Sequence, residues 1–123
     1  MRLLLDTHVA IWWLSGDRRL STATRTAVEE APDAFLSVVS LWEILIKQDA
    51  GRLELPAGFA DALRDDFMEL PLTFDHAREG RALPRVHRDP FDRMLVAQAR
   101  VEILTIVTAD RTLAEYGVPI LAA

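Results

Sequence analysis

An apolar run close to the first residue, Leu3-Leu4-Leu5, ends on Asp6, and this feature limits most strongly the folds that the chain can adopt. A short, uninterrupted apolar run is typical of a strand that is buried on both faces in a parallel sheet. A second run, Ile103 to Thr108, is followed by Asp110 in the same way. Because parallel strands need helical crossover connections, the two runs predict an α/β protein.

The sequence between and after these runs alternates between further strands and helices. Strands are predicted at 35–39 and, as a short terminal edge strand, within 117–121, and a brief strand or extended link at 68–72. The predicted helices span residues 8–14, 21–31, 40–50, 56–66, 74–81, 90–99 and 111–116. We therefore predict a single domain over residues 1–123, with a central parallel sheet flanked by helices in an α/β/α sandwich.

The composition excludes several classes of protein. There is no cysteine, so neither disulfides nor thiolate metal sites are available. The net charge of −5 argues against a protein that coats nucleic acid through bulk charge, although a nuclease remains possible. No run resembles a signal peptide or a membrane span, and we therefore expect a soluble cytoplasmic protein.

Four carboxylates stand where a parallel sheet would bring them together. Asp6 and Asp110 follow strands, and Glu43 and Asp92 are predicted in the first turns of helices. Each acid has a simpler interpretation: Asp6 as a helix cap, Glu43 as a solvated residue, and Asp92 as a capping-box acid behind the cap Asp89. These interpretations weaken when four acids coincide at one sheet edge, where ligands of α/β proteins bind.

Such a cluster would repel itself strongly unless it held divalent cations. Hard Mg²⁺ or Mn²⁺ suits all-oxygen ligands, and the lack of a His/Cys cluster argues against zinc. These ions can activate water and stabilise the charge that builds on a phosphodiester during in-line displacement. The acids therefore favour a metal-dependent phosphodiesterase.

Four segments that contain these acids resemble the successive motifs of PIN-domain proteins, specifically the VapC-type toxins of bacterial toxin-antitoxin pairs. The segments are Leu3–His8, Ser37–Ile44, His87–Ala99 and Thr105–Asp110. The resemblance implies a Mg²⁺- or Mn²⁺-dependent endoribonuclease in which Asp6, Glu43, Asp92 and Asp110 are the catalytic, metal-binding acids and Thr108 supports them. It also implies a homodimer and inhibition by a small VapB-type antitoxin that covers the active groove.

Two further expectations concern contacts with partners. Arg85, Arg88 and Arg93 lie in an arginine-rich segment and are candidates for RNA phosphate contacts, although genome composition can also enrich arginine. The adjacent Trp12 and Trp13 cannot face the same way on a helix, so one of them is expected at a surface, as a dimer contact.

Rival functions are separated by single residues. A haloacid-dehalogenase-type phosphatase needs a second Asp where this chain has His8. A response-regulator receiver domain needs paired acids at the first strand end and a late Lys, whereas the only Lys is Lys47. The alternative that remains is a PIN-fold module that binds RNA or protein without cutting.

Overall fold

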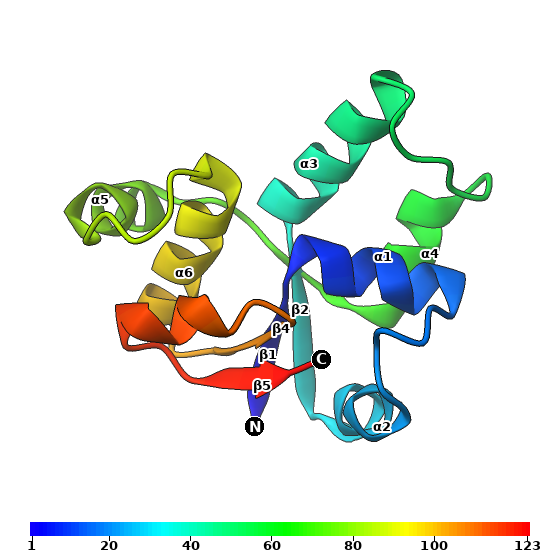
Figure 1. Ribbon diagram of the computed structural model, residues 1–123, viewed down its shortest axis with the longest axis horizontal. Coiled ribbons are helices and arrows are strands. Elements are labelled where there is room, and N and C mark those ends of the chain that lie inside the picture. Colours follow the sequence, from blue (N-terminus) through cyan, green and yellow to red (C-terminus); the bar gives the residue numbers. More distant parts are fainter.

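Five parallel strands form one sheet in the order β3-β2-β1-β4-β5, and the computed structural model describes all residues 1–123 (Figure 1). The strands are β1 Arg2–Leu5, β2 Asp33–Ser37, β3 Met68–Leu70, β4 Thr105–Thr108 and β5 Ile120–Ala122. Central β1 pairs with β2 and β4, so that Leu4 lies between Phe35 and Ile106. The predicted parallel sheet, with its buried first strand and β5 at an edge, is confirmed.

Helices cover both faces of the sheet and complete the predicted α/β/α sandwich (Figure 1). They are α1 Thr7–Ser15, α2 Thr22–Glu30, α3 Val38–Asp49, α4 Phe59–Asp66, α5 Phe74–Ala82, α6 Pro90–Glu102 and the 3₁₀ helix η1 Arg111–Tyr116. None of them is long and apolar enough to cross a bilayer.

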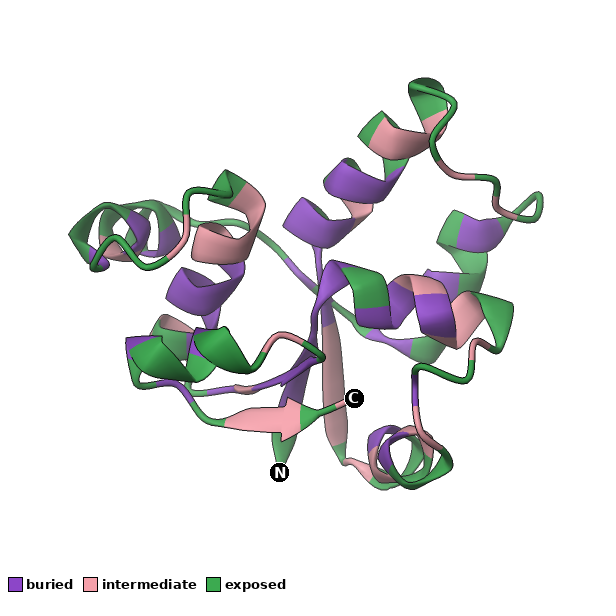
Figure 2. Cartoon of the chain, viewed as in Figure 1, coloured by how far each residue is buried: buried purple, intermediate pink, exposed green.

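The alternation of side chains along β1 divides the core into two layers. Leu3 and Leu5 pack with the residues of α1 to α4, whereas Leu4 packs with those of α6 and η1. Figure 2 shows the central strands β1 and β4 mostly buried, and β2 and β5 largely intermediate, between helices that are buried on their inner faces. The rigid sheet fixes the residues that follow each strand.

Two predicted boundaries are wrong because local capping decides them. Strand β2 ends at Ser37, whose hydroxyl accepts a hydrogen bond from the backbone N–H of Val39 (3.0 Å) and so starts α3 two residues earlier than predicted. Val38 and Val39 are thus helical despite their β-branched side chains. Helix α6 continues to Glu102, and Ile103, predicted in a strand, ends that helix with a φ of 57°.

The paired tryptophans face different ways, as predicted, and Trp13 is only partly buried, so that it reaches the surface. Trp12 is buried, and Trp13 donates from its indole N–H to Asp66 (3.0 Å) and packs against Phe67. The exposed tryptophan is Trp42 on α3, with 60% of its surface accessible. Trp13 and Trp42 are thus the two tryptophans that reach the surface.

Candidate active site at the carboxyl edge of the sheet

The ends of β1 and β4 place two of the predicted acids and the threonine that links them. The backbone N–H of Asp6 donates to the carbonyl of Val107 (3.0 Å), which extends the pairing of the two strands. Buried Thr108 donates from its hydroxyl to Oδ2 of Asp6 (2.7 Å) and accepts from the backbone N–H of Asp110 (3.0 Å). Thr108 therefore orients Asp6 and the chain at Asp110 together.

Asp6 occupies the N-cap position of α1 but does not act as a cap. Its side chain makes no capping hydrogen bond. The residue is 5% exposed, and its Oδ1 atom is buried without any hydrogen-bond partner. Burial raises the pKa of Asp6, although the Thr108 hydroxyl partly opposes the shift. A buried, unpartnered carboxylate oxygen indicates a site for a ligand rather than a structural cap.

Glu43 and Asp92 come from α3 and α6, which pack against each other beside the strand ends. Glu43 lies in the second turn of α3, not the first, because the helix begins at Val38. It is 7% exposed, which excludes the solvated interpretation, and Lys47 one turn later is 3.2 Å from its carboxylate. The i, i+4 spacing of Glu43 and Lys47 is the sequence signal for this ion pair.

Asp92 follows a separate cap at the start of α6. Oδ1 of Asp89 accepts a hydrogen bond from the N–H of Phe91 (2.8 Å), and Pro90 fills the first helical position. No hydrogen bond returns from Asp92 to the backbone of Asp89, so the capping-box interpretation of Asp92 is wrong. Its carboxylate is free for another role.

The carboxylates of Asp6, Glu43 and Asp92 lie close enough together for their charges to raise the pKa of Asp6 and of Asp92. Burial, followed by the nearby carboxylates of Asp6, Asp89 and Glu43, raises the pKa of Asp92 to about 7. Asp6 likewise feels the charge of Glu43. Like charges at close range disfavour the ionised forms, and an opposite charge between them would reverse this effect. The strand ends and the two helices thus bring together a cluster of acids that attracts cations.

Asp110 joins the cluster through a residue that the sequence analysis missed. Its Oδ2 atom lies 3.0 Å from Nε2 of His87, and its Oδ1 atom accepts from the N–H and hydroxyl of Thr112. Burial alone would raise the pKa of Asp110, but these bonds outweigh burial and hold it below its usual value. Ligand atoms of His87, Asp92 and Asp110 all lie within 4.8 Å of one another.

These residues fit a divalent cation. The donor set consists mainly of carboxylate oxygens, which Mg²⁺ and Mn²⁺ prefer. One buried oxygen of Asp6 has no hydrogen-bond partner. The signal that could have revealed His87 is its place in the same short segment as Asp92, five residues earlier.

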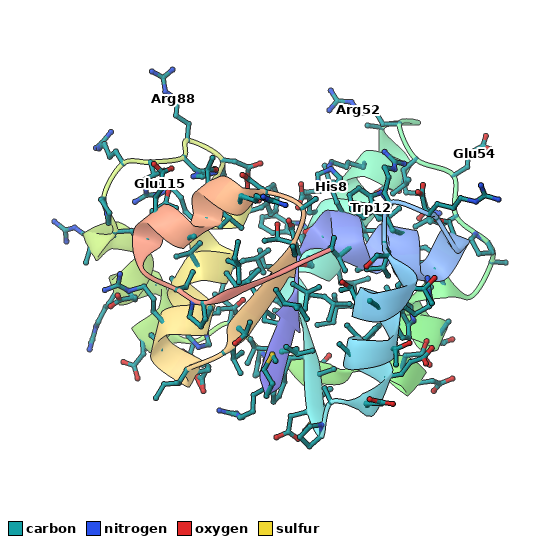
Figure 3. The ribbon with its side chains drawn as sticks, turned by 60° about the horizontal axis from the view of Figure 1, so that its bottom comes forward. His8, Trp12, Arg52, Glu54, Arg88 and Glu115 are labelled. Atoms are coloured by element: carbon teal, nitrogen blue, oxygen red, sulfur yellow. The ribbon has the colours of Figure 1, made fainter.

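The predicted phosphate-binding arginines fall into two groups. Arg85 and Arg88 are exposed on the α5–α6 loop (residues 83–89) and line a surface hollow together with Arg81. In Figure 3, Arg88 projects into solvent from one half of the molecule, and Arg52 from the other. These side chains are free to meet a polyanion.

Arg93 lines the same hollow but, unlike Arg85 and Arg88, it is bonded to the backbone. Its guanidinium donates to the carbonyls of Pro84 (2.9 Å), Gly80 (3.0 Å) and Leu83 (3.2 Å), and less closely to that of His87 (3.5 Å). The terminal N–H groups of the Arg93 guanidinium therefore already have acceptors. Arg93 fixes the shape of the α5–α6 loop.

We predict that Arg93→Ala destabilises the protein by about 2 kcal/mol, because several carbonyls lose a charged donor. For a domain of this size that corresponds to a fall in melting temperature of roughly 4–7 °C. The matched control is Arg88→Ala, which removes an exposed arginine without such contacts and should change stability by less than about 0.5 kcal/mol. Equal melting temperatures for the two variants would contradict this role of Arg93.

Comparison with known proteins agrees with this geometry. A family model described as PIN domain matches residues 3–119. The chain is 32% identical over 121 residues to "Ribonuclease VapC22" of Mycobacterium tuberculosis (strain ATCC 25618 / H37Rv), an alignment that covers 95% of this chain and 93% of that protein.

Solved structures of similar fold come from toxin-antitoxin complexes. A chain of DNA-bound VapBC from Salmonella typhimurium superposes with a TM-score of 0.74 at 16% identity, covering 99% of this chain and 98% of that one. A chain of a Klebsiella pneumoniae toxin-antitoxin complex gives 0.70 at 20% identity, covering 97% and 95%. At these identities the likeness concerns the fold. Together with the family model and the curated relative, it shows that the chain belongs to the PIN domain family, as the four acidic segments predicted.

Proposed function

We propose that this protein is a Mg²⁺- or Mn²⁺-dependent endoribonuclease and the toxin of a toxin-antitoxin pair. The observation that carries the proposal is the meeting of Asp6, Glu43, Asp92 and Asp110 at one sheet edge, with a buried oxygen of Asp6 left without a partner. The relative that is named a ribonuclease supports RNA as the substrate. The cytoplasm is the compartment in which such a protein would meet RNA.

The proposed mechanism assigns a role to each part of the site. A bound divalent cation would supply a water of lowered pKa and a positive charge for the phosphodiester. Asp6, Glu43, Asp92 and Asp110 would hold that cation, with Asp6 kept in place by Thr108. Arg85 and Arg88 would bind neighbouring phosphates of the strand and so position the scissile bond.

The first proposed partner is a VapB-type antitoxin. The structures with similar chains include VapBC complexes from Rickettsia felis and Salmonella typhimurium, and both are described as bound to DNA. An antitoxin that covers the acidic cluster would inhibit cleavage by excluding RNA. Co-purification of this chain with the small protein encoded beside it would test the pairing.

The second proposed partner is another copy of this chain. Helix α3 exposes an apolar stripe of Val38, Trp42, Leu45 and Ile46, spaced as on one helical face. In a two-fold dimer the same patch serves both subunits, so one such stripe is sufficient. We expect a dimer in solution that Trp42→Glu converts to a monomer, as measured by light scattering across the micromolar range.

Phe74→Glu is the matched control for the dimer, because Phe74 is an even more exposed aromatic residue on a different helix, α5. This variant should remain dimeric. A wild-type protein that scatters as a monomer throughout the same range would contradict the homodimer.

The proposed activity is tested with purified protein and single-stranded RNA in Mg²⁺, Mn²⁺ or EDTA. We expect cleavage with either ion and none in EDTA, with activity restored by excess Mn²⁺. RNA binding without cleavage under all three conditions would favour the alternative, a PIN-fold module that binds RNA or protein without cutting.

A further inference from the structure

His87 is held from several sides at the edge of the acidic cluster. Its backbone N–H donates to the hydroxyl of Tyr116 (2.7 Å), and its ring lies against the ring of Tyr116, with centroids 5.6 Å apart. Its Nε2 atom lies 3.0 Å from Oδ2 of Asp110 and 2.9 Å from the hydroxyl oxygen of Thr112. The imidazole therefore joins the α5–α6 loop to the start of η1.

The ring nitrogen of His87 that has no hydrogen-bond partner indicates which tautomer the imidazole adopts. Nδ1 is buried and has no hydrogen-bond partner. Because a buried N–H without an acceptor is rarer than an unused lone pair, the proton belongs on Nε2. The Nε2–H group then donates to Asp110 and Thr112, and the Thr112 hydroxyl donates onward to Oδ1 of Asp110.

This hydrogen-bond pattern separates His87 from the metal ligands that surround it. Its nitrogen lies within 4.8 Å of the carboxylates of Asp92 and Asp110, a spacing that would also suit a three-ligand metal site. An Nε2 atom that carries a proton and donates it has no lone pair for a cation. Binding through Nε2 would move the proton to Nδ1, where no acceptor is present.

We propose that His87 is a positioning residue: it holds the carboxylate of Asp110 in place beside Asp92 for the divalent cation. The side chain of Asp110 is 41% exposed and stands at the first turn of a short 3₁₀ helix, so the sheet alone does not fix its direction. The neighbouring Asp92 carboxylate would repel it. His87, with Thr112, supplies the donors that keep Asp110 there; the inference thus rests on the proposed metal-dependent function.

The first measurement is Mn²⁺ affinity by calorimetry in the absence of RNA. His87→Leu keeps the size of the side chain without a donor, and we expect Mn²⁺ to bind at least about tenfold more weakly, as when the hydrogen-bond partner of a metal ligand is removed. His87→Gln can place an amide N–H near the former Nε2 position and should stay within about threefold of wild type. Equal losses in the two variants would overturn the proposal.

The decisive measurement repeats His87→Leu in an Asp110→Asn background. If His87 acts through Asp110, its replacement has no further effect on Mn²⁺ affinity once the carboxylate is gone. Additive losses would show that His87 acts independently of Asp110 and would overturn the proposal. Thermal melts of all variants establish that the proteins compared are folded.

Pulsed electron paramagnetic resonance of the Mn²⁺-loaded protein distinguishes positioning from direct ligation. We expect no directly bound nitrogen. The control is His8→Asn, which replaces the exposed histidine two residues after Asp6. A strong nitrogen coupling that persists in His8→Asn but disappears in His87→Leu would make His87 a ligand and overturn the proposal. Wild type that cleaves RNA in Mn²⁺ but shows this coupling contradicts only the inference, whereas wild type that binds no Mn²⁺ contradicts the metal-dependent function as well.

Discussion

Asp92→Asn is expected to lower the rate of Mn²⁺-dependent RNA cleavage at least about a hundredfold, which corresponds to about 2.7 kcal/mol of lost transition-state stabilisation. Asp92 is the acid on which the charges of Asp6 and Glu43 both act, so it stands closest to the centre of the cluster. Asparagine keeps the shape of the side chain but removes the charge that would hold a cation. The measurement is the initial rate of cleavage of a labelled RNA.

Asp89→Asn is the matched control for this experiment. It removes the same charge three residues away on the same helix entrance, and asparagine caps a helix as well as aspartate does. The cap bond to the N–H of Phe91 is therefore retained, and cleavage should stay within a few-fold of wild type. A folded Asp92→Asn protein that cuts RNA at the wild-type rate would remove Asp92 from the catalytic set.

The parts of the site that follow strands could be predicted from sequence, because burial on both faces leaves a clear signal. Leu3 to Leu5 can only be central in a sheet, and the first polar residue after them must reach the carboxyl edge. The same argument places Thr108. Strand pairing then brings the ends of β1 and β4 side by side without any knowledge of the loops.

The parts that depend on contacts between loops could not be predicted. His87 meets Asp110 across 23 positions of sequence, and no periodicity encodes that meeting. Arg93 belongs to a segment rich in arginine, and only the structure shows that its donors are used by backbone carbonyls. The exposure of Trp42 could not be predicted either, because a helix with apolar residues on several sides does not reveal which of them face solvent.

The stability of the metal-free protein is expected to depend on pH through Asp92. Asp92 has a pKa of about 7 in the folded state against an ordinary value of 3.8. Because the folded value is raised, the folded state binds the proton more tightly, and this stabilisation is complete below pH 4 and lost as the pH rises through 7. Solvent screening at a half-buried carboxyl reduces the full linkage energy to about 2 kcal/mol.

Melting temperatures in EDTA should therefore fall between pH 5 and pH 8, and the fall should be smaller in Asp92→Asn. Asp6 contributes in the same direction, since burial raises its pKa too. Melts of wild type and Asp92→Asn at both pH values measure the difference. A wild-type protein whose stability rises over this range would contradict the raised pKa values.

Asp6→Asn is expected to leave the metal-free protein as stable as wild type, or somewhat more stable, when both are melted in EDTA at pH 8. The substitution removes a charge that is buried and repelled by Glu43, and it keeps an oxygen to accept from Thr108. It forfeits no helix cap, because the Asp6 side chain makes no capping bond. A site kept for function at the expense of stability behaves in this way.

Mn²⁺ should reverse the order of the two proteins. An ion that binds only the folded state stabilises it by about 2.7 kcal/mol at a hundredfold excess over its dissociation constant, a rise in melting temperature of roughly 5–10 °C for a domain of this size. Wild type should show this rise, and Asp6→Asn much less of it, because the buried oxygen that lacks a partner in wild type no longer carries charge. If Asp6→Asn were clearly destabilised in EDTA and still gained as much from Mn²⁺ as wild type, Asp6 would be a structural residue, and the metal site proposed around it would be wrong.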